Sequence, residues 1–178
     1  MLCAMNGLIV SGPPGSGKTT LARALATELD RSVHLQTDQF FAAITRGFVK
    51  PWLAEAADQN AVVVRAIAAA AVEYMRGGYF VLIDGVVLPW ALAIYRERVA
   101  ETGLDVGIAV LLPGEDETAR RGLARPEDYG LTAEVYREMH GQFVRAGFGA
   151  GEVIDSTGMS VAELVVEVRR RGLVVGGA

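Results

Sequence analysis

One eight-residue segment places the strongest constraint on how this chain can fold. It consists of Gly12, Pro13, Pro14, Gly15, Ser16, Gly17, Lys18 and Thr19, and it matches the pattern G-x-x-x-x-G-K-S/T at every fixed position. A short apolar run, residues 8–11, precedes the segment, and an amphipathic stretch, residues 18–29, follows it. Glycines in this setting let consecutive backbone N–H groups point at phosphate oxygens, and the start of a helix adds its positive dipole end. The segment therefore predicts a strand, a phosphate-binding loop and a helix, in that order.

The side chains after the last glycine of this loop have the chemistry to hold a nucleoside triphosphate. Lys18 is a point charge that reaches the terminal phosphates, and the hydroxyl of Thr19 is a ligand for Mg²⁺. Thr20 continues the nucleotide-binding segment into the helix. We therefore expect residues 12–20 to bind a nucleoside triphosphate together with Mg²⁺. Both ATP and GTP remain candidates for this nucleotide.

Strand-like and helix-like segments alternate along the chain. Apolar runs at residues 8–11, 33–35, 79–84, 106–112 and 152–155 predict five strands. Helical spacing, caps and breaks predict helices at residues 18–29, 39–45, 55–76, 89–102, 115–125, 132–146 and 160–171. Such alternation is typical of an α/β protein with a doubly wound parallel sheet, whose ligands bind at the carboxyl ends of the strands. The 178 residues fit a single domain, residues 1–178.

Composition and charge argue against several classes of protein. The formal net charge is −4, and the one dense basic run, at residues 169–171, is typical of a helix end, so we expect no nucleic-acid partner. The first apolar run is too short for a signal peptide or a membrane span, and Arg65 interrupts the longer apolar stretch at residues 61–72. We therefore expect a soluble, cytoplasmic protein with no membrane partner. Its single cysteine, Cys3, cannot form an intramolecular disulfide.

Two acids stand at the predicted ends of strands. Asp38 follows the second strand, where it is placed either to accept a proton from an attacking hydroxyl or to cap the next helix. Asp84 ends the third strand after four apolar residues, as does the acid that holds Mg²⁺, directly or through water, beside a phosphate-binding loop. Thr19 and Asp84 are therefore the predicted metal ligands.

Three arginines gather in one short helical segment. Arg120, Arg121 and Arg125 lie within six residues, and Arg121 and Arg125 share a helix face. Arginines in such a place clamp a transferring phosphoryl group or stack on a base, and a solvated basic face is the alternative. We expect all three to be catalytic, within a lid at residues 115–131, and Arg121 to contact the nucleotide as well.

Residues after the second and third strands are candidates for an acceptor pocket. Trp52 and Trp90 each stand beside a proline in a predicted loop, which favours them over the other aromatic residues, most of which are typical of core. The residues that we expect to contact the substrate are Asp38, Phe41, Trp52, Arg65, Gly85 and Trp90.

With these residues placed, the chain resembles the small P-loop kinases, the group that contains chloramphenicol phosphotransferase, gluconate kinase and the zeta-toxin-like kinases. The resemblance covers nearly the whole chain and is strongest at residues 12–20, 37–38, 83–87 and 141–143. It implies a three-layer fold with a five-stranded parallel sheet in the order 2-3-1-4-5, flanked by helices and carrying a short lid. It also implies that Asp38 is the base for the acceptor hydroxyl, that lid arginines contact the nucleotide phosphates, and that Ser156 and Thr157 belong to a base-binding turn.

The resemblance implies NTP-dependent transfer of the γ-phosphate to a hydroxyl of a small molecule, by a monomer or a homodimer. The abundance of Ala, Gly, Val and Arg resembles proteins of high-GC bacteria, many of which modify antibiotics, so a phenicol or nucleoside antibiotic is the first acceptor by analogy. A gluconate-like sugar-acid kinase is the alternative, for which Arg46, Lys50 and Arg65 are the nearby basic residues. A nucleotide-binding regulator without acceptor chemistry is an alternative of another class.

Overall fold

Five parallel strands form the centre of the protein. The computed structural model describes residues 5–124 and 132–174. The strands are β1 (Gly7–Ser11), β2 (Ser32–Gln36), β3 (Phe80–Gly85), β4 (Val106–Leu111) and β5 (Val153–Ile154). All neighbouring pairs are parallel and the order is β2-β3-β1-β4-β5, which confirms the predicted sheet.

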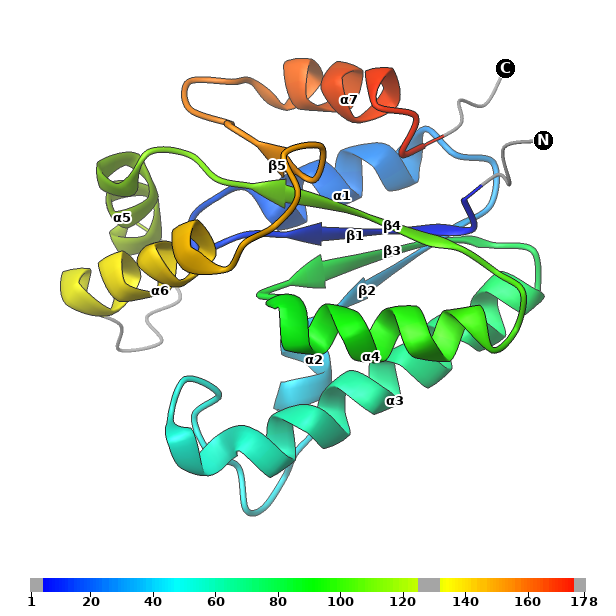
Figure 1. Ribbon diagram of the computed structural model, residues 1–178, viewed down its shortest axis with the longest axis horizontal. Helices are drawn as coiled ribbons and strands as arrows, with labels where there is room; N and C mark the ends of the chain where they lie inside the picture. Colours follow the sequence, from blue (N-terminus) through cyan, green and yellow to red (C-terminus); the bar gives the residue numbers. More distant parts are fainter. Residues whose placement is uncertain (1–4, 125–131, 175–178) are drawn as a thin grey trace.

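Helices cover both faces of this sheet (Figure 1). They are α1 (Lys18–Thr27), α2 (Thr37–Ala42), α3 (Ala57–Arg76), α4 (Pro89–Ala100), α5 (Glu115–Leu123), α6 (Ala133–Arg145) and α7 (Val161–Arg170), with a 3-10 turn η1 (Ala54–Ala56). α1 and α7 lie on one face and α3 and α4 on the other, whereas α5 and α6 lie toward the carboxyl ends of the strands.

Each face of the sheet has its own apolar core. Leu8 and Val10 of β1 pack in the cluster that includes α1 and α7, and Ile9 between them packs in the cluster that includes α3 and α4. Because side chains alternate along a strand, a strand covered on both faces is apolar at consecutive positions. This explains why the central strands appear in the sequence as short continuous apolar runs.

α3 keeps its apolar side chains against the sheet. Val64, Ile67 and Ala71 are buried at helical spacing, while Arg65 is exposed on the same helix. Within residues 5–124 and 132–174, no helix is both long and apolar enough to cross a membrane.

One helix begins earlier than predicted, and one residue that was expected in a loop lies in a helix. β2 runs directly into α2, whose N-cap is Gln36, so Asp38 lies in the first turn and does not cap the helix. α4 begins at Pro89, as predicted, because the fixed φ of proline suits the first helical position. Trp90 therefore lies in this helix and not in the loop that was expected for it.

The carboxyl ends of three neighbouring strands are held in one register. Ser11 at the end of β1 pairs with Gly85 of β3, and Gln36 at the end of β2 pairs with Asp84. The Ser11 hydroxyl accepts from the Val87 N–H (3.0 Å) and donates to the Val87 carbonyl (2.9 Å). The start of the phosphate-binding loop is thereby tied to the segment that follows β3.

Candidate nucleotide-binding and phosphotransfer site

The loop between β1 and α1 depends on glycine at three positions, Gly12, Gly15 and Gly17. Gly17, the N-cap of α1, has a φ of 94°, and a side chain there would meet open space, so the left-handed backbone alone requires glycine. Gly12 has a φ of 144°, and a Cβ atom there would lie 2.2 Å from the carbonyl oxygen of Leu111. Glycine therefore allows the loop to turn into α1 and to pack closely on the end of β4.

Two buried polar side chains of the loop fit a phosphate ligand. The Nζ of Lys18 donates to the carbonyl of Pro13 (2.9 Å), so this buried side chain curls back over the loop. The Oγ of Ser16 is buried and has no hydrogen-bond partner among the described residues, although buried hydroxyls nearly always have one. A phosphate oxygen would accept from this hydroxyl, so the loop fits a nucleotide phosphate.

Asp84 at the end of β3 connects the loop to β2. Its Oδ1 accepts from the Thr19 hydroxyl (3.2 Å), and its Oδ2 lies 2.5 Å from the Nε2 of His34. Asp84 is buried, as expected for an acid at the end of an apolar strand. The structure therefore brings together the two predicted metal ligands and adds His34. The sequence analysis missed His34 because only the pairing of β2 with β3 places it beside Asp84.

The oxygen atoms of Thr19 and Asp84 fit Mg²⁺. Mg²⁺ prefers oxygen ligands and is usually held by one or two protein groups together with phosphates and water. In the described part of the chain, no group of three or more His, Cys, Asp or Glu side chains is arranged to hold a metal ion. A metal held by a hydroxyl, a carboxylate and nucleotide phosphates agrees with this arrangement.

A pocket of about 310 Å³ opens beside the loop. Its lining residues are Gly15, Ser16, Gly17, Thr20, Arg121, Met159, Ser160, Val161 and Leu164. Four of these come from the start of α7 and the residues just before it, which the sequence analysis did not single out. Their positions beside the loop follow only from the packing of α7 next to α1.

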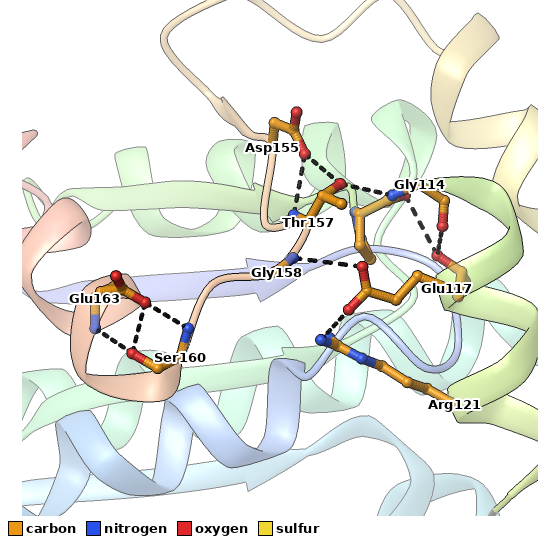
Figure 2. Close-up of polar contacts among 10 residues, drawn as sticks. Gly114, Glu117, Arg121, Asp155, Thr157, Gly158, Ser160 and Glu163 are labelled. Atoms are coloured by element: carbon orange, nitrogen blue, oxygen red, sulfur yellow. Dashed lines mark hydrogen bonds and ion pairs between the residues drawn. The ribbon is translucent and has the colours of Figure 1, made fainter.

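Hydrogen bonds connect α5 and the residue before it to the turn that follows β5 (Figure 2). Glu117 of α5 pairs with Arg121, and its other carboxylate oxygen accepts from the Gly158 N–H (3.4 Å). Thr157 accepts from the Gly114 N–H (2.9 Å) and donates its own hydroxyl to Asp155 (2.6 Å). Arg121, which lines the pocket, is thus part of one hydrogen-bonded unit built from two segments far apart in the sequence.

The predicted base-binding residues have different surroundings within this turn. The Thr157 hydroxyl and N–H both donate to Asp155, and these bonds lower the pKa of the Asp155 carboxyl below its usual value. Ser156 is buried, and its Oγ has no hydrogen-bond partner among the residues that the structure describes. A second orphaned hydroxyl therefore lies in a segment expected to meet the nucleotide.

The predicted acceptor-side residues are spread over five segments. Gly85 is buried at the end of β3, where a Cβ atom would lie 2.2 Å from the hydroxyl of Thr37, so glycine is needed for this close packing. Asp38 follows Thr37 directly and is exposed. Phe41 is half-buried and packs against the core on the α3 face. Trp52, Trp90 and Arg65 are exposed.

The segment that carries Trp52 is held by two carboxamides of α3. Gln59 accepts from the Val49 N–H (2.8 Å) and donates to the Val49 carbonyl (2.7 Å). Asn60 donates to the carbonyl of Pro51 (2.7 Å). The sequence analysis did not single out Gln59 or Asn60. Neither residue belongs to a recognisable motif, and their hydrogen-bond partners lie eight or more residues earlier in the chain.

Comparison with known protein families shows to which family the chain belongs. Residues 8–146, more than half of the sequence, match the AAA domain family. The chain belongs to the AAA domain family. No curated protein matches its sequence.

Solved structures share the fold of this AAA domain protein at low sequence identity. A tunicamycin resistance protein from Deinococcus radiodurans is 16% identical, with 98% of this chain and 99% of that chain covered and a TM-score of 0.70. A gluconokinase from Sinorhizobium meliloti 1021 is 17% identical, with 96% and 93% covered and a TM-score of 0.69. A shikimate kinase from Acinetobacter baumannii, solved with shikimate, is 20% identical, with 93% and 92% covered and a TM-score of 0.56. The predicted resemblance to small P-loop kinases is confirmed.

The three predicted arginines of this AAA domain protein differ in position. Arg121 lines the pocket beside the loop. Arg120 is exposed on the same helix. Arg125 lies outside the described residues, as does the end of the predicted lid, residues 125–131.

Proposed function

We propose that this protein is an NTP-dependent O-phosphotransferase that moves a γ-phosphate to a hydroxyl of a small molecule. The observation that carries the proposal is the contact between Thr19 at the phosphate-binding loop and Asp84 at the end of the neighbouring strand. This pair places two oxygen ligands for Mg²⁺ beside a loop shaped for phosphates. The P-loop kinase fold supports the same reaction.

Each group of the donor site has a role in this proposal. The backbone of residues 12–17 and the Lys18 ammonium bind the phosphates of ATP or GTP, and the pocket beside Arg121 takes the rest of the nucleotide. Thr19 and Asp84 hold Mg²⁺, which neutralises charge on the phosphate oxygens when it is bound. Arg121, with Arg120 and Arg125, stabilises the negative charge that develops on the transferring group.

Asp38 is the proposed general base. The acceptor oxygen forms a bond to the γ-phosphorus while the bond from that phosphorus to the β–γ bridging oxygen breaks, and the hydroxyl proton passes to the Asp38 carboxylate. The products are the phosphorylated acceptor and a nucleoside diphosphate. Support comes from the pairing of Gln36 with Asp84, which brings the start of α2 to the carboxyl edge of the sheet where the loop lies.

The acceptor that we propose is an antibiotic or a related natural product. The exposed indoles of Trp52 and Trp90 offer apolar surface for such a molecule, with Phe41 and Gly85 as further contacts. One structure with the same fold is a tunicamycin resistance protein. We further propose cytoplasmic action by a monomer or a homodimer, without nucleic acid.

A sugar-acid kinase is the second candidate. The fold is shared with a gluconokinase at a nearly equal TM-score. Lys50 lies over the Trp52 ring, 5.6 Å from its centroid, so a cation is present beside this aromatic residue to meet a carboxylate. Arg65 on α3 is the other candidate for binding the carboxylate of a sugar acid.

The test is a transfer screen with γ-labelled ATP and GTP. The acceptors are phenicol and nucleoside antibiotics, sugar acids and nucleosides, and the enzymes are the wild type, Lys18→Ala and Lys50→Ala. We expect wild-type transfer to an antibiotic, none with Lys18→Ala, and unchanged nucleotide affinity with Lys50→Ala, which removes the only other lysine.

Any other result of the screen contradicts the proposed acceptor, the proposed transfer activity or the proposed donor site. Transfer to sugar acids alone selects the second candidate. Nucleotide binding without transfer to any acceptor favours a regulator. A wild-type protein that binds neither nucleotide, or a Lys18→Ala variant with normal transfer, contradicts the proposal.

A further inference from the structure

The imidazole of His34 contacts the carboxylate of Asp84, and the reaction proposed above assigns no role to this contact. Its Nε2 lies 2.5 Å from Oδ2 of Asp84, and both side chains are largely buried, at 15% and 7% exposure. Because an ionised carboxylate only accepts hydrogen bonds, we assign this ring nitrogen as the donor. His34 comes from β2, whereas Asp84 comes from β3, so the contact joins two strands.

The contact divides the two oxygens of Asp84 between different partners. Oδ2 is engaged by His34, and Oδ1 is left to face the hydroxyl of Thr19. A carboxylate held at only one oxygen can still rotate about its Cβ–Cγ bond, whereas two fixed partners on opposite oxygens define its plane. The His34 contact therefore decides which oxygen of Asp84 is presented to the loop.

We propose that His34 is a positioning residue for Mg²⁺: it orients the Asp84 carboxylate so that Oδ1 faces the metal site beside Thr19. This inference rests on the proposed function, because it requires a magnesium nucleotide at the loop. Residues that donate hydrogen bonds to metal-binding groups orient those groups, and their removal costs about 10- to 100-fold in metal affinity or activity. His34 itself contacts neither the nucleotide nor the metal in this scheme.

The position of His34 in the sheet separates this role from ordinary packing. In the register of β2 and β3, His34 pairs with Leu82, and Gln36 pairs with Asp84. The Gln36 carboxamide is directed elsewhere, since its oxygen accepts from the Gln39 side chain (2.8 Å). Gln36 is thus a matched control on the same strand, nearer to Asp84 in register but engaged with a different partner.

The experiment compares ATP affinity with excess Mg²⁺ and with EDTA, by titration calorimetry. The proteins are the wild type, His34→Leu, His34→Gln and Gln36→Leu, and thermal unfolding checks that each is folded. The glutamine amide nitrogen can donate from nearly the same place as Nε2, so His34→Gln keeps the hydrogen bond and His34→Leu loses it.

We expect the gain in ATP affinity due to Mg²⁺ to fall about 10- to 100-fold in His34→Leu. Affinity in EDTA should be unchanged, His34→Gln should recover most of the magnesium effect, and Gln36→Leu should behave as the wild type. Equal loss with and without Mg²⁺, an unchanged magnesium effect in His34→Leu, or no recovery in His34→Gln would overturn the inference. Failure of the wild type to bind ATP would instead overturn the proposed function.

Discussion

Asp38 is an exposed carboxylate in the first turn of α2. The first turn of a helix favours negative charge, so a carboxylate suits this position. Because Gln36 is the N-cap, Asp38→Asn removes the charge without removing a cap. We expect nucleotide affinity and stability to be retained, while phosphoryl transfer falls by about 10²- to 10⁴-fold, the usual contribution of a general base.

A matched control is available for this prediction. Asp58 is also an exposed acid in the first turn of a helix, α3, and has no proposed role in the reaction. Transfer rates of the wild type, Asp38→Asn and Asp58→Asn are measured side by side with the acceptor found in the screen. Equal rates for all three would remove Asp38 as the base.

At the scale of elements, α5 presents Arg121 to the pocket through its ion pair with Glu117. If Arg121 meets charge that develops only during transfer, Arg121→Ala lowers kcat more than it weakens acceptor binding. Steady-state kinetics with the acceptor distinguishes these effects. Arg145→Ala is the control, because Arg145 forms an exposed ion pair with Glu138 on α6 and should leave both constants unchanged. A rise in acceptor KM at constant kcat would place Arg121 in the acceptor pocket.

At the scale of the whole molecule, the two-faced sheet is the scaffold that holds the site. Ile67 of α3 is fully buried against it, whereas Val62 on the same helix is 57% exposed. Ile67→Val should lower the free energy of unfolding by about 0.5–1.5 kcal/mol and Ile67→Ala by about 2–5 kcal/mol, because the larger deletion leaves a cavity. Val62→Ala should change it by less than about 0.5 kcal/mol. Denaturant unfolding measures all three, and equal effects of Ile67→Ala and Val62→Ala would contradict this account of the core.

The features that local sequence carries were predictable. The loop at residues 12–19 matches a pattern that specifies its own strand, turn and helix. Continuous apolar runs identify strands buried on both faces, and their alternation with helices predicts a parallel sheet. Asp84 was predictable as well, because an acid after four apolar residues stands at a strand end that must reach the loop.

Helix starts were less predictable, because the same residues suit two positions. Asp38 is an acceptable N-cap, but β2 extends to Gln36 and leaves no room for a cap at Asp38. Trp90 follows a proline, which suits both a loop and the first position of a helix. In both cases, strand pairing and helix packing decide between local alternatives.

Tertiary structure alone decided the contacts between distant segments. His34 and Asp84 meet only because β2 lies beside β3 in one register, and nothing within either strand specifies that register. The pocket beside the loop is completed by Met159, Ser160 and Leu164, from α7 and the residues just before it, about 140 residues further along the chain. Glu117 joins Arg121 to Gly158 across a gap of 41 residues between α5 and the turn before α7. Parallel strands need long crossover connections, so residues that cooperate at one edge of the sheet are necessarily far apart in the sequence. The sequence by itself therefore determined which types of functional group the chain carries. The crossover connections of the folded sheet decided which of these groups lie next to one another.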